Sequence, residues 1–154
     1  MSVSVETFPS SRYHSLFREQ AFNGQVVLVT GGGSGIGRCT AHELAALGAQ
    51  VVISGRTESK LQQVCEEITA DGGKATYRSC DIREEDQVKA LIAGIISDFG
   101  RLDGLVNNAG GQFPAPLSMI SANGFQAVIR NNLNGTFLMM REAYTQWMEQ
   151  HGGS

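Results

Sequence analysis

A glycine-rich turn that follows an apolar run is the feature that most constrains how this chain folds. The run Val26–Val29 leads directly into Thr30–Gly37, which reads Thr-Gly-Gly-Gly-Ser-Gly-Ile-Gly and opens a helical pattern. Glycines let the backbone come close to a phosphate, and the free N–H groups and dipole at the start of a helix favour an anion. The sequence therefore predicts a strand, a turn and a helix that together hold a nucleotide pyrophosphate.

The spacing of the glycines separates this turn from two other phosphate loops. In a Gly-x-Gly-x-x-Gly pattern begun at Gly31, the last glycine would fall on Ile36. A P-loop is excluded because Arg38 and Cys39 stand where a Lys-Ser/Thr pair would grip a phosphate. A flexible glycine turn is the alternative interpretation, and the position between a strand and a helix argues against it.

Short apolar runs alternate with amphipathic stretches along the chain. We expect strands near residues 25–30, 49–54, 75–80 and 102–107. Between them apolar residues recur at the spacing of one helix face, which is typical of βαβ units. Three glycines fall where left-handed helix ends are wanted, namely Gly48, Gly72 and Gly100. The pattern predicts an α/β fold, a doubly wound (Rossmann-type) parallel sheet truncated after the fourth strand and the long helices that follow it.

After the fourth expected strand, a loop rich in Gly and Pro leads into a helical region from about residue 118 to 150. Asn123-Gly124 and Asn131-Asn132 weaken its first part, so the region is predicted to form two helices. Its second part carries an apolar stripe of Phe137, Met140, Tyr144, Trp147 and Met148. Such a stripe is typical of a core or a subunit interface. The closing His151–Ser154 is expected to turn into a fifth strand.

Composition narrows the class of protein. The chain has 154 residues, is 42% hydrophobic and carries a formal charge of −3 without a basic stripe, which argues against nucleic acid as the principal partner. No run approaches the ~18 apolar residues of a membrane span, and the first residues lack the apolar core of an export signal. Cys39, Cys65 and Cys80 are expected to be small buried thiols. We therefore expect a cytoplasmic protein without a membrane partner.

Four motifs in order resemble the short-chain dehydrogenase/reductase family. They are Thr30–Gly37, Cys80–Ile82 at the end of the third expected strand, Asn107–Gly110 at the end of the fourth, and Asn132–Gly135 in the helical region. The resemblance implies an N-terminal extension over residues 1–22 and a cofactor-binding domain over residues 23–154. It covers only the N-terminal, cofactor-binding part of the family pattern.

The resemblance also implies where a cofactor would lie. Ser34 to Gly37 would contact the pyrophosphate, Asp81 and Ile82 would lie beside the adenine, and Asn108 to Gly110 would border the ribose and nicotinamide. The cofactor-binding residues expected on this basis are Gly31, Ser34, Gly35, Ile36, Gly37, Arg56, Asp81, Ile82, Asn108, Ala109 and Gly110. Asn132 matches the asparagine that supports the family's catalytic proton relay. The alternative for Asn132 is an amide that bonds local backbone and bends its helix.

The end of the second expected strand bears on the choice between NAD and NADP. A carboxylate there would bind the ribose 2′-OH and repel a 2′-phosphate. Gly55 stands where NAD-preferring members of the family carry Asp, and Arg56 follows, free to pair with a phosphate. NADP is therefore the expected cofactor and NAD the less favoured one. The alternative is that Arg56 is only a solvated loop cation.

Within the family, the chain resembles citronellol/citronellal dehydrogenase-like proteins and peroxisomal trans-2-enoyl-CoA and dienoyl-CoA reductases. The resemblance implies hydride transfer to or from a hydrophobic carbonyl, alcohol or enoyl substrate, either a small hydrophobic molecule or an acyl-CoA. Gln112 and Phe113 would border that substrate. The alternative for Phe113 is a ring that anchors the loop in the core.

The family's Tyr-x-x-x-Lys pair, whose lysine lowers the tyrosine pKa for proton exchange with substrate, does not occur in the chain. Tyr144, for example, is followed four residues later by Met148. The competing hypothesis is therefore a catalytically inert NADP-binding module or a truncated product. The resemblance implies that a helix near residues 131–150 helps to form a subunit interface, so a homo-oligomer is expected.

Overall fold

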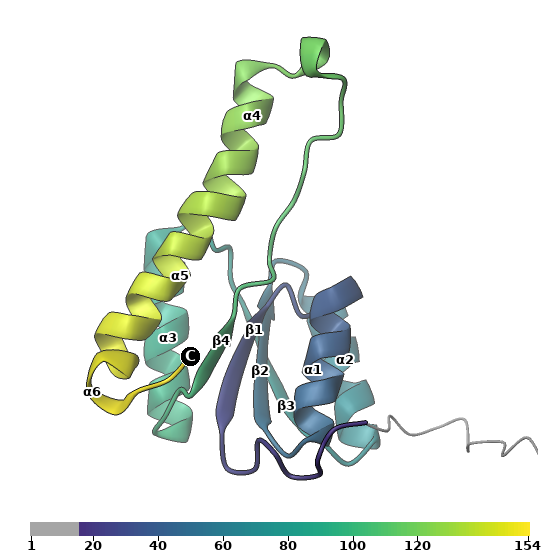
Figure 1. The fold of residues 1–154 in the computed structure, drawn as a ribbon, viewed down its shortest axis with the longest axis vertical. Helices are drawn as coiled ribbons and strands as arrows, with labels where there is room; N and C mark the ends of the chain where they lie inside the picture. Colours follow the sequence, from purple (N-terminus) through teal and green to yellow (C-terminus); the bar gives the residue numbers. More distant parts are fainter. Residues whose placement is uncertain (1–15) are drawn as a thin grey trace, which may run out of the picture.

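Four parallel strands form the sheet in the computed structural model, which describes residues 16–154. The strands lie in the order β3-β2-β1-β4 (Figure 1). Their bounds are β1 Val26–Thr30, β2 Gln50–Gly55, β3 Lys74–Ser79 and β4 Gly104–Val106. The sequence-based prediction of the fold is confirmed. Most of the expected extension over residues 1–22 lies outside the described residues.

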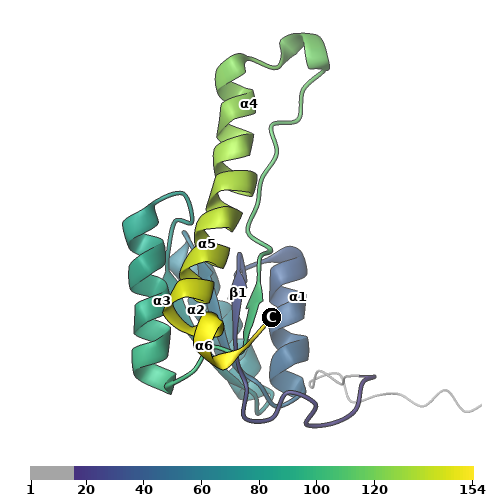
Figure 2. The same ribbon diagram turned by 60° about the vertical axis from the view of Figure 1, so that its left-hand side comes forward.

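Helices cover both faces of the sheet, as a doubly wound fold requires (Figures 1 and 2). On one face α1 (Gly35–Ala46) and α2 (Glu58–Ala70) pack on the side chains of Val27, Val29 and Ile53. On the other face α3 (Glu85–Phe99) and α5 (Gly135–Ala143) pack on side chains such as Leu28, which alternate with the first set along each strand. The helices therefore bury the central strands β1 and β2 on both sides, whereas the side chains of the edge strand β3 are half-buried or exposed.

The expected helix ends at glycines are confirmed. Gly48, Gly72 and Gly100 have φ of +94°, +87° and +68°, in the left-handed region that a side chain disfavours. Each of them directly precedes the short connection to the next strand. These tight ends keep the connections to the next strands short. The carboxyl ends of all four strands meet at one edge of the sheet because every strand pair is parallel.

The prediction of two helices after the fourth strand is wrong. A short 3₁₀ turn at Leu117–Met119 precedes a single continuous helical rod made of α4 (Ala122–Ile129), α5 and α6 (Glu149–His151). Five-residue π-helical turns at 130–134 and 144–148 join the three parts. The weak helix formers at the first junction widen the helix by a π turn instead of ending it, because their backbones keep helical angles. The α4 part of this rod extends beyond the carboxyl edge of the sheet, whereas α5 lies beside α3 (Figure 1). We call the whole rod the arm.

The chain ends beside β4. The backbone N–H of Ser154 donates to the carbonyl of Asp103 at 3.0 Å, and the N–H of Leu105 donates to the carbonyl of Ser154 at 2.7 Å. Gly152 and Gly153 make the turn with positive φ. Ser154 therefore hydrogen-bonds to β4 as a neighbouring strand would.

The cysteines differ from the sequence-based expectation at one position. Cys65 and Cys80 are buried, and burial raises the pKa of each thiol to about 11. Cys39 is exposed, because its place on α1 faces solvent. All three cysteines are free.

Among the described residues, no helix is long and apolar enough to cross a membrane.

Candidate functional site

The glycine turn is packed so closely that side chains do not fit at several of its positions. A Cβ added to Gly37 would lie 2.4 Å from both the Asn108 Nδ2 and the Gly31 carbonyl oxygen. One added to Gly32 would lie 2.6 Å from the Ile53 side chain. The N–H groups of Gly31 and Gly32 donate to the Ser54 carbonyl at 2.7 and 3.2 Å, which ties the turn to the end of β2. The turn is thus a fixed structure and not a flexible linker.

The first turn of α1 opens toward solvent at the carboxyl edge of the sheet. Ser34 is the N-cap residue and makes no side-chain capping hydrogen bond, and no acidic residue lies in the first turn. Ser34, Gly35 and Ile36 are exposed, with Gly35 at φ +54° and nothing within 4 Å of an added Cβ. N–H groups at an uncapped helix start attract anions. The turn and helix together can hold a phosphate.

A buried threonine links the turn to the loop after β4. Thr30 Oγ1 accepts hydrogen bonds from the N–H groups of Asn108 and Ala109, both at 3.0 Å, and donates to the Val106 carbonyl at 3.2 Å. The Asn108 Nδ2 donates to the Thr30 carbonyl at 2.9 Å. Thr30 begins the glycine motif, but the motif alone predicts no role for its hydroxyl. The sequence does place a hydroxyl at the end of an apolar strand. Because a buried hydroxyl needs a hydrogen-bond partner, that position could have indicated a contact with a neighbouring loop.

A cavity of about 90 Å³ brings together the ends of three strands. It is lined at the end of β2 by Gly55 and Arg56, after β3 by Cys80, Asp81 and Ile82, after β4 by Ala109 and Gly110, and by Asn131 of the arm. Most of the predicted cofactor residues outside the glycine turn therefore share one cavity. Asn131 was not predicted, because the motif in the helical region begins at its neighbour Asn132.

The Asp81 carboxylate in this cavity is strongly bound by an arginine two residues on. The Arg83 Nε donates to Oδ1 at 2.8 Å and to Oδ2 at 3.1 Å, and Nη2 donates to Oδ2. These hydrogen bonds, with a smaller effect of the nearby Arg56 charge, lower the pKa of Asp81 to about 2. Arg56 itself is exposed beside the cavity. The site thus combines an ionised carboxylate with two guanidinium groups.

Asn132 ties the arm to the loop after β4. Its Oδ1 accepts from the Gly111 N–H at 2.9 Å, and its Nδ2 donates to the Gly111 carbonyl at 2.9 Å. The amide bonds backbone 21 residues away, and not the local backbone that the alternative interpretation required. The loop it holds continues into Gln112 and Phe113, both exposed.

Phe113 does not lie in the core. It is 50% exposed, and its ring lies against Gly124 near the start of α4, where an added Cβ would come within 3.2 Å of the ring. The structure therefore contradicts the alternative in which Phe113 anchors the loop in the core. Neither Phe113 nor Gln112 lines the cavity at the strand ends.

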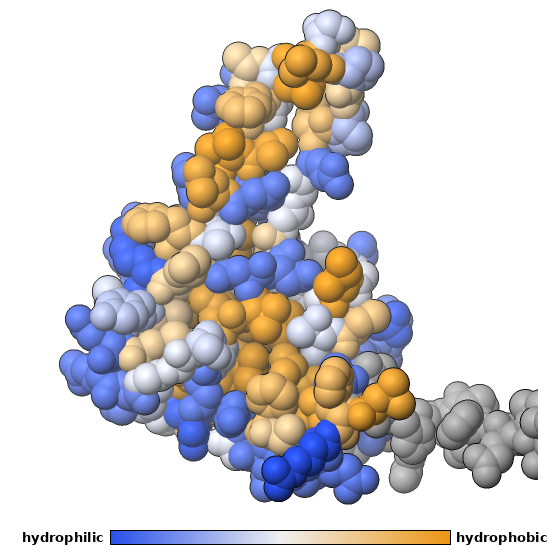
Figure 3. Space-filling view, viewed as in Figure 1, coloured by the Kyte–Doolittle hydropathy of each residue, from blue (hydrophilic) through white to orange (hydrophobic). Residues whose placement is uncertain are grey.

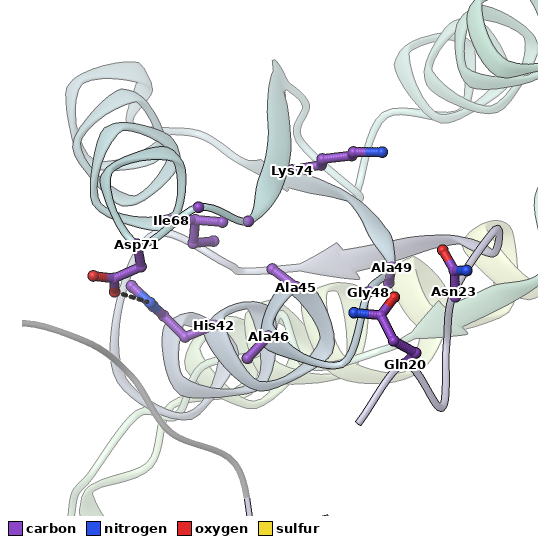
Figure 4. A pocket seen from close by; sticks show the side chains of 12 residues that line it. Gln20, Asn23, His42, Ala45, Ala46, Gly48, Ala49, Ile68, Asp71 and Lys74 are labelled. Atoms are coloured by element: carbon purple, nitrogen blue, oxygen red, sulfur yellow. Dashed lines mark ion pairs between the residues drawn. The ribbon is translucent and has the colours of Figure 1, made fainter. Parts of the chain in front are cut away.

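A second pocket, of about 260 Å³, lies at the opposite edge of the sheet (Figure 4). His42, Asp71 and Lys74 line it together with Gln20 and Asn23. The His42 Nδ1 lies 3.9 Å from the Asp71 Oδ2. The pocket is formed where α1 and α2 end and strands begin, and none of the predicted site residues lines it. It is therefore separate from the site at the carboxyl ends of the strands.

The parallel sheet, the glycine turn after β1 and the cavity at the strand ends define a Rossmann-type α/β protein. The family description "short chain dehydrogenase" matches residues 25–154. The chain belongs to the short chain dehydrogenase family.

Individual relatives agree with the family. A probable 2,4-dienoyl-CoA reductase of Bacillus subtilis is 36% identical over 126 residues, which are 82% of this chain and 50% of the relative. The solved structure of a citronellol catabolism dehydrogenase of Pseudomonas aeruginosa PAO1 is 55% identical with a TM-score of 0.88, over 92% of this chain and 58% of that one. A metagenomic short-chain oxidoreductase in complex with NADP is 38% identical with a TM-score of 0.79, over 86% of this chain and 60% of that one. The chain spans about half the length of the curated relative and somewhat more of the two solved chains.

Proposed function

We propose that this chain binds a nicotinamide dinucleotide at the carboxyl edge of its sheet and takes part in hydride transfer as an oxidoreductase. The observation that carries the proposal is the shared site, in which an uncapped helix start and a glycine turn lie beside a cavity lined by the ends of β2, β3 and β4. Ligands of open α/β sheets bind at this edge. The NADP complex of the metagenomic relative and the NAD+-bound state of a xylitol dehydrogenase, 32% identical with a TM-score of 0.82, support a nicotinamide cofactor.

The residues present fit such a cofactor. Gly35 leaves the backbone open to a pyrophosphate, and the N–H groups from Ser34 to Gly37 would bind it. Gly31 and Gly37 let the turn pack closely against Asn108. Asp81 and Ile82 would lie beside the adenine, and Asn108 to Gly110 beside the ribose and nicotinamide. When bound, the cofactor supplies or accepts the hydride. The domain that holds it would span residues 23–154.

We propose NADP as the preferred cofactor. Arg56 lies at the end of β2, exposed and beside the cavity, where it can pair with a ribose 2′-phosphate. Gly55 leaves no carboxylate at the strand end to repel that phosphate. Of the described residues that line the cavity, Asp81 alone carries a carboxylate, and this carboxylate is paired with Arg83.

The substrate proposed is a hydrophobic carbonyl, alcohol or enoyl compound, including acyl-CoA esters. The names of two relatives, a citronellol catabolism dehydrogenase and a probable 2,4-dienoyl-CoA reductase, support this class. Gln112 and Phe113 are exposed on the loop beyond Gly110 and are available to border it. Asn132 would support the proton relay by holding the same loop.

The free cysteines suit a cytoplasmic location.

An alternative is a module that binds NADP without chemistry. The sequence feature that favours it is the lack of a Tyr-x-x-x-Lys pair within the 154 residues. Turnover of NADPH with an enal or an enoyl-CoA by this chain would exclude the alternative. Binding of NADPH without turnover would support it.

The cofactor preference is tested by reversing one charge. In the variant Arg56→Asp, NADPH affinity should fall about tenfold or more, because a charge-assisted pair is replaced by repulsion, while NADH affinity should not fall. Isothermal titration with both cofactors measures this. Arg18→Asp, the same change at an exposed position before β1, is the control and should bind both as the unmodified chain does. Equal NADPH affinity in all three proteins would remove Arg56 from the account.

A further inference from the structure

Hydrogen bonds from Arg83 and to Gln87 hold Asp81 by its carboxylate and by its backbone. Besides the side-chain fork, the backbone N–H of Arg83 donates to the Asp81 Oδ1 at 3.1 Å. The backbone N–H of Asp81 in turn donates to the Gln87 Oε1 at 2.9 Å, which ties the residue to the first turn of α3. Both ends of Asp81 are therefore held by groups that lie just after it in the chain.

The fork is not part of the cavity surface. Asp81 and Ile82 line the cavity, whereas Arg83, which grips the carboxylate, is not among its lining residues. The Asp81 side chain is 18% exposed and that of Arg83 is 34% exposed. The guanidinium thus acts on the carboxylate from outside the space that a ligand would fill.

The hydrogen bonds leave the carboxylate with acceptor capacity. Each carboxylate oxygen can accept about two hydrogen bonds. Oδ1 receives the Arg83 backbone N–H and Nε, so it is saturated. Oδ2 receives Nη2 and only a longer share of Nε, at 3.1 Å. Oδ2 can therefore accept a further donor.

We propose, on the basis of the nucleotide site proposed above, that Arg83 is a positioning residue that aims the Asp81 carboxylate at the exocyclic amino group of the adenine. A base that carries a carbonyl at that place, such as hypoxanthine, would set an oxygen against the carboxylate and bind more weakly. The low pKa of Asp81 keeps this carboxylate an acceptor at neutral pH. Selection of the base then depends on a residue that touches neither base nor phosphate.

The test compares NADPH with its hypoxanthine analogue, in which a carbonyl replaces the adenine amino group. We expect the unmodified chain to bind NADPH about tenfold more tightly than the analogue, because an amino donor is lost and a repulsion gained. In Arg83→Met, which keeps the stem and removes the fork, the ratio should fall to within about twofold, because the freed carboxylate must be ordered at binding. Arg83→Lys keeps the positive charge without the two-pronged hydrogen bond, so it should also lose the tenfold preference for NADPH over the analogue.

A matched control is available at the opposite edge of the sheet. Arg101 also forks onto an aspartate two residues away, with Nε and Nη2 each 2.7 Å from an oxygen of Asp103. Arg101→Met removes the same charge and should keep the tenfold ratio.

The outcomes separate this inference from the proposed function. If the chain binds NADPH but the base ratio is unchanged or larger in Arg83→Met, or absent in the unmodified chain, the role of Arg83 is overturned and the cofactor site stands. If none of the proteins binds NADPH, the proposed function fails and the inference fails with it.

Discussion

The Asp81–Arg83 pair makes a pH-dependent contribution to stability. The pair lowers the pKa of Asp81 from its usual 3.8 to about 2, so the folded chain holds this carboxylate ionised more firmly than the unfolded chain does. A depressed pKa stabilises the fold above the unfolded value, and that stabilisation is lost as the pH falls toward the folded value.

We therefore expect Arg83→Met to reduce the free energy of unfolding more at pH 6 than near pH 2, with the difference shrinking below about pH 4. Urea unfolding of both proteins across this range measures it. A difference that stays constant or grows as the pH falls would contradict the assignment.

At the scale of single residues, the sequence patterns predicted where site residues lie better than which groups they hydrogen-bond to. Asp81, Ile82, Ala109 and Gly110 were expected at the strand ends, and they share the cavity there. The fork from Arg83 was not predicted, because an Arg-Asp spacing of two residues brings the charges together only in some backbone conformations. The bonds of Asn132 to Gly111 depend on where the arm crosses the loop, which a single sequence does not specify.

The helical arm carries an exposed apolar stripe along one side. Leu133, Phe137, Met140 and Tyr144, spaced by four, three and four residues, are 62%, 56%, 56% and 53% exposed. Figure 3 shows apolar side chains also gathered over α4 and the segment before it. Of the stripe predicted from the sequence, Trp147 and Met148 instead pack against the core. The stripe predicted from the sequence therefore has an exposed part, Phe137 to Tyr144, and a part that packs against the core, Trp147 and Met148.

We propose that this stripe mediates self-association, as the expected homo-oligomer requires. Sedimentation of the unmodified chain should show a species larger than a monomer. Phe137→Ser with Met140→Ser should weaken the assembly by tenfold or more, because burial of each side chain contributes about 1.5–3 kcal/mol. Leu117→Ser with Met119→Ser, which removes two exposed apolar groups at the tip of the arm, is the control. An unmodified chain that sediments as a monomer at all concentrations would contradict the proposal.

At the scale of elements, all four strands were predicted within about two residues at each end, including the short β4 at Gly104–Val106. Buried parallel strands give near-continuous apolar runs, and a glycine ends each helix between them. The runs therefore predicted the strands, and the glycines predicted where each helix stops. The arm was predicted as two helices because asparagine and glycine lower helix propensity. Contacts with the loop at Asn132 and with α3 along α5 outweigh that local preference.

For the whole molecule, the location of the candidate site follows from topology. Right-handed crossovers place the helices on both faces and every carboxyl strand end at one edge, so motifs far apart in the sequence meet there. This could be predicted. The second pocket, around His42 and Asp71, could not, because the residues that line it come from the ends of α1 and α2 and the connections beside them and belong to no motif.

The central claim is that a nicotinamide dinucleotide binds at the carboxyl edge of the sheet. Backbone amide NMR during titration with NADPH tests it most directly. The account predicts saturable shifts at Ser34–Gly37, Asp81 and Gly110, and their loss in Gly37→Ala, whose methyl would displace Asn108. Gly94→Ala, where the nearest atom to an added Cβ is the Arg78 Cζ at 3.5 Å, should keep them. Shifts that gather around His42 and Asp71 instead, or no saturable shifts at all, would contradict the account.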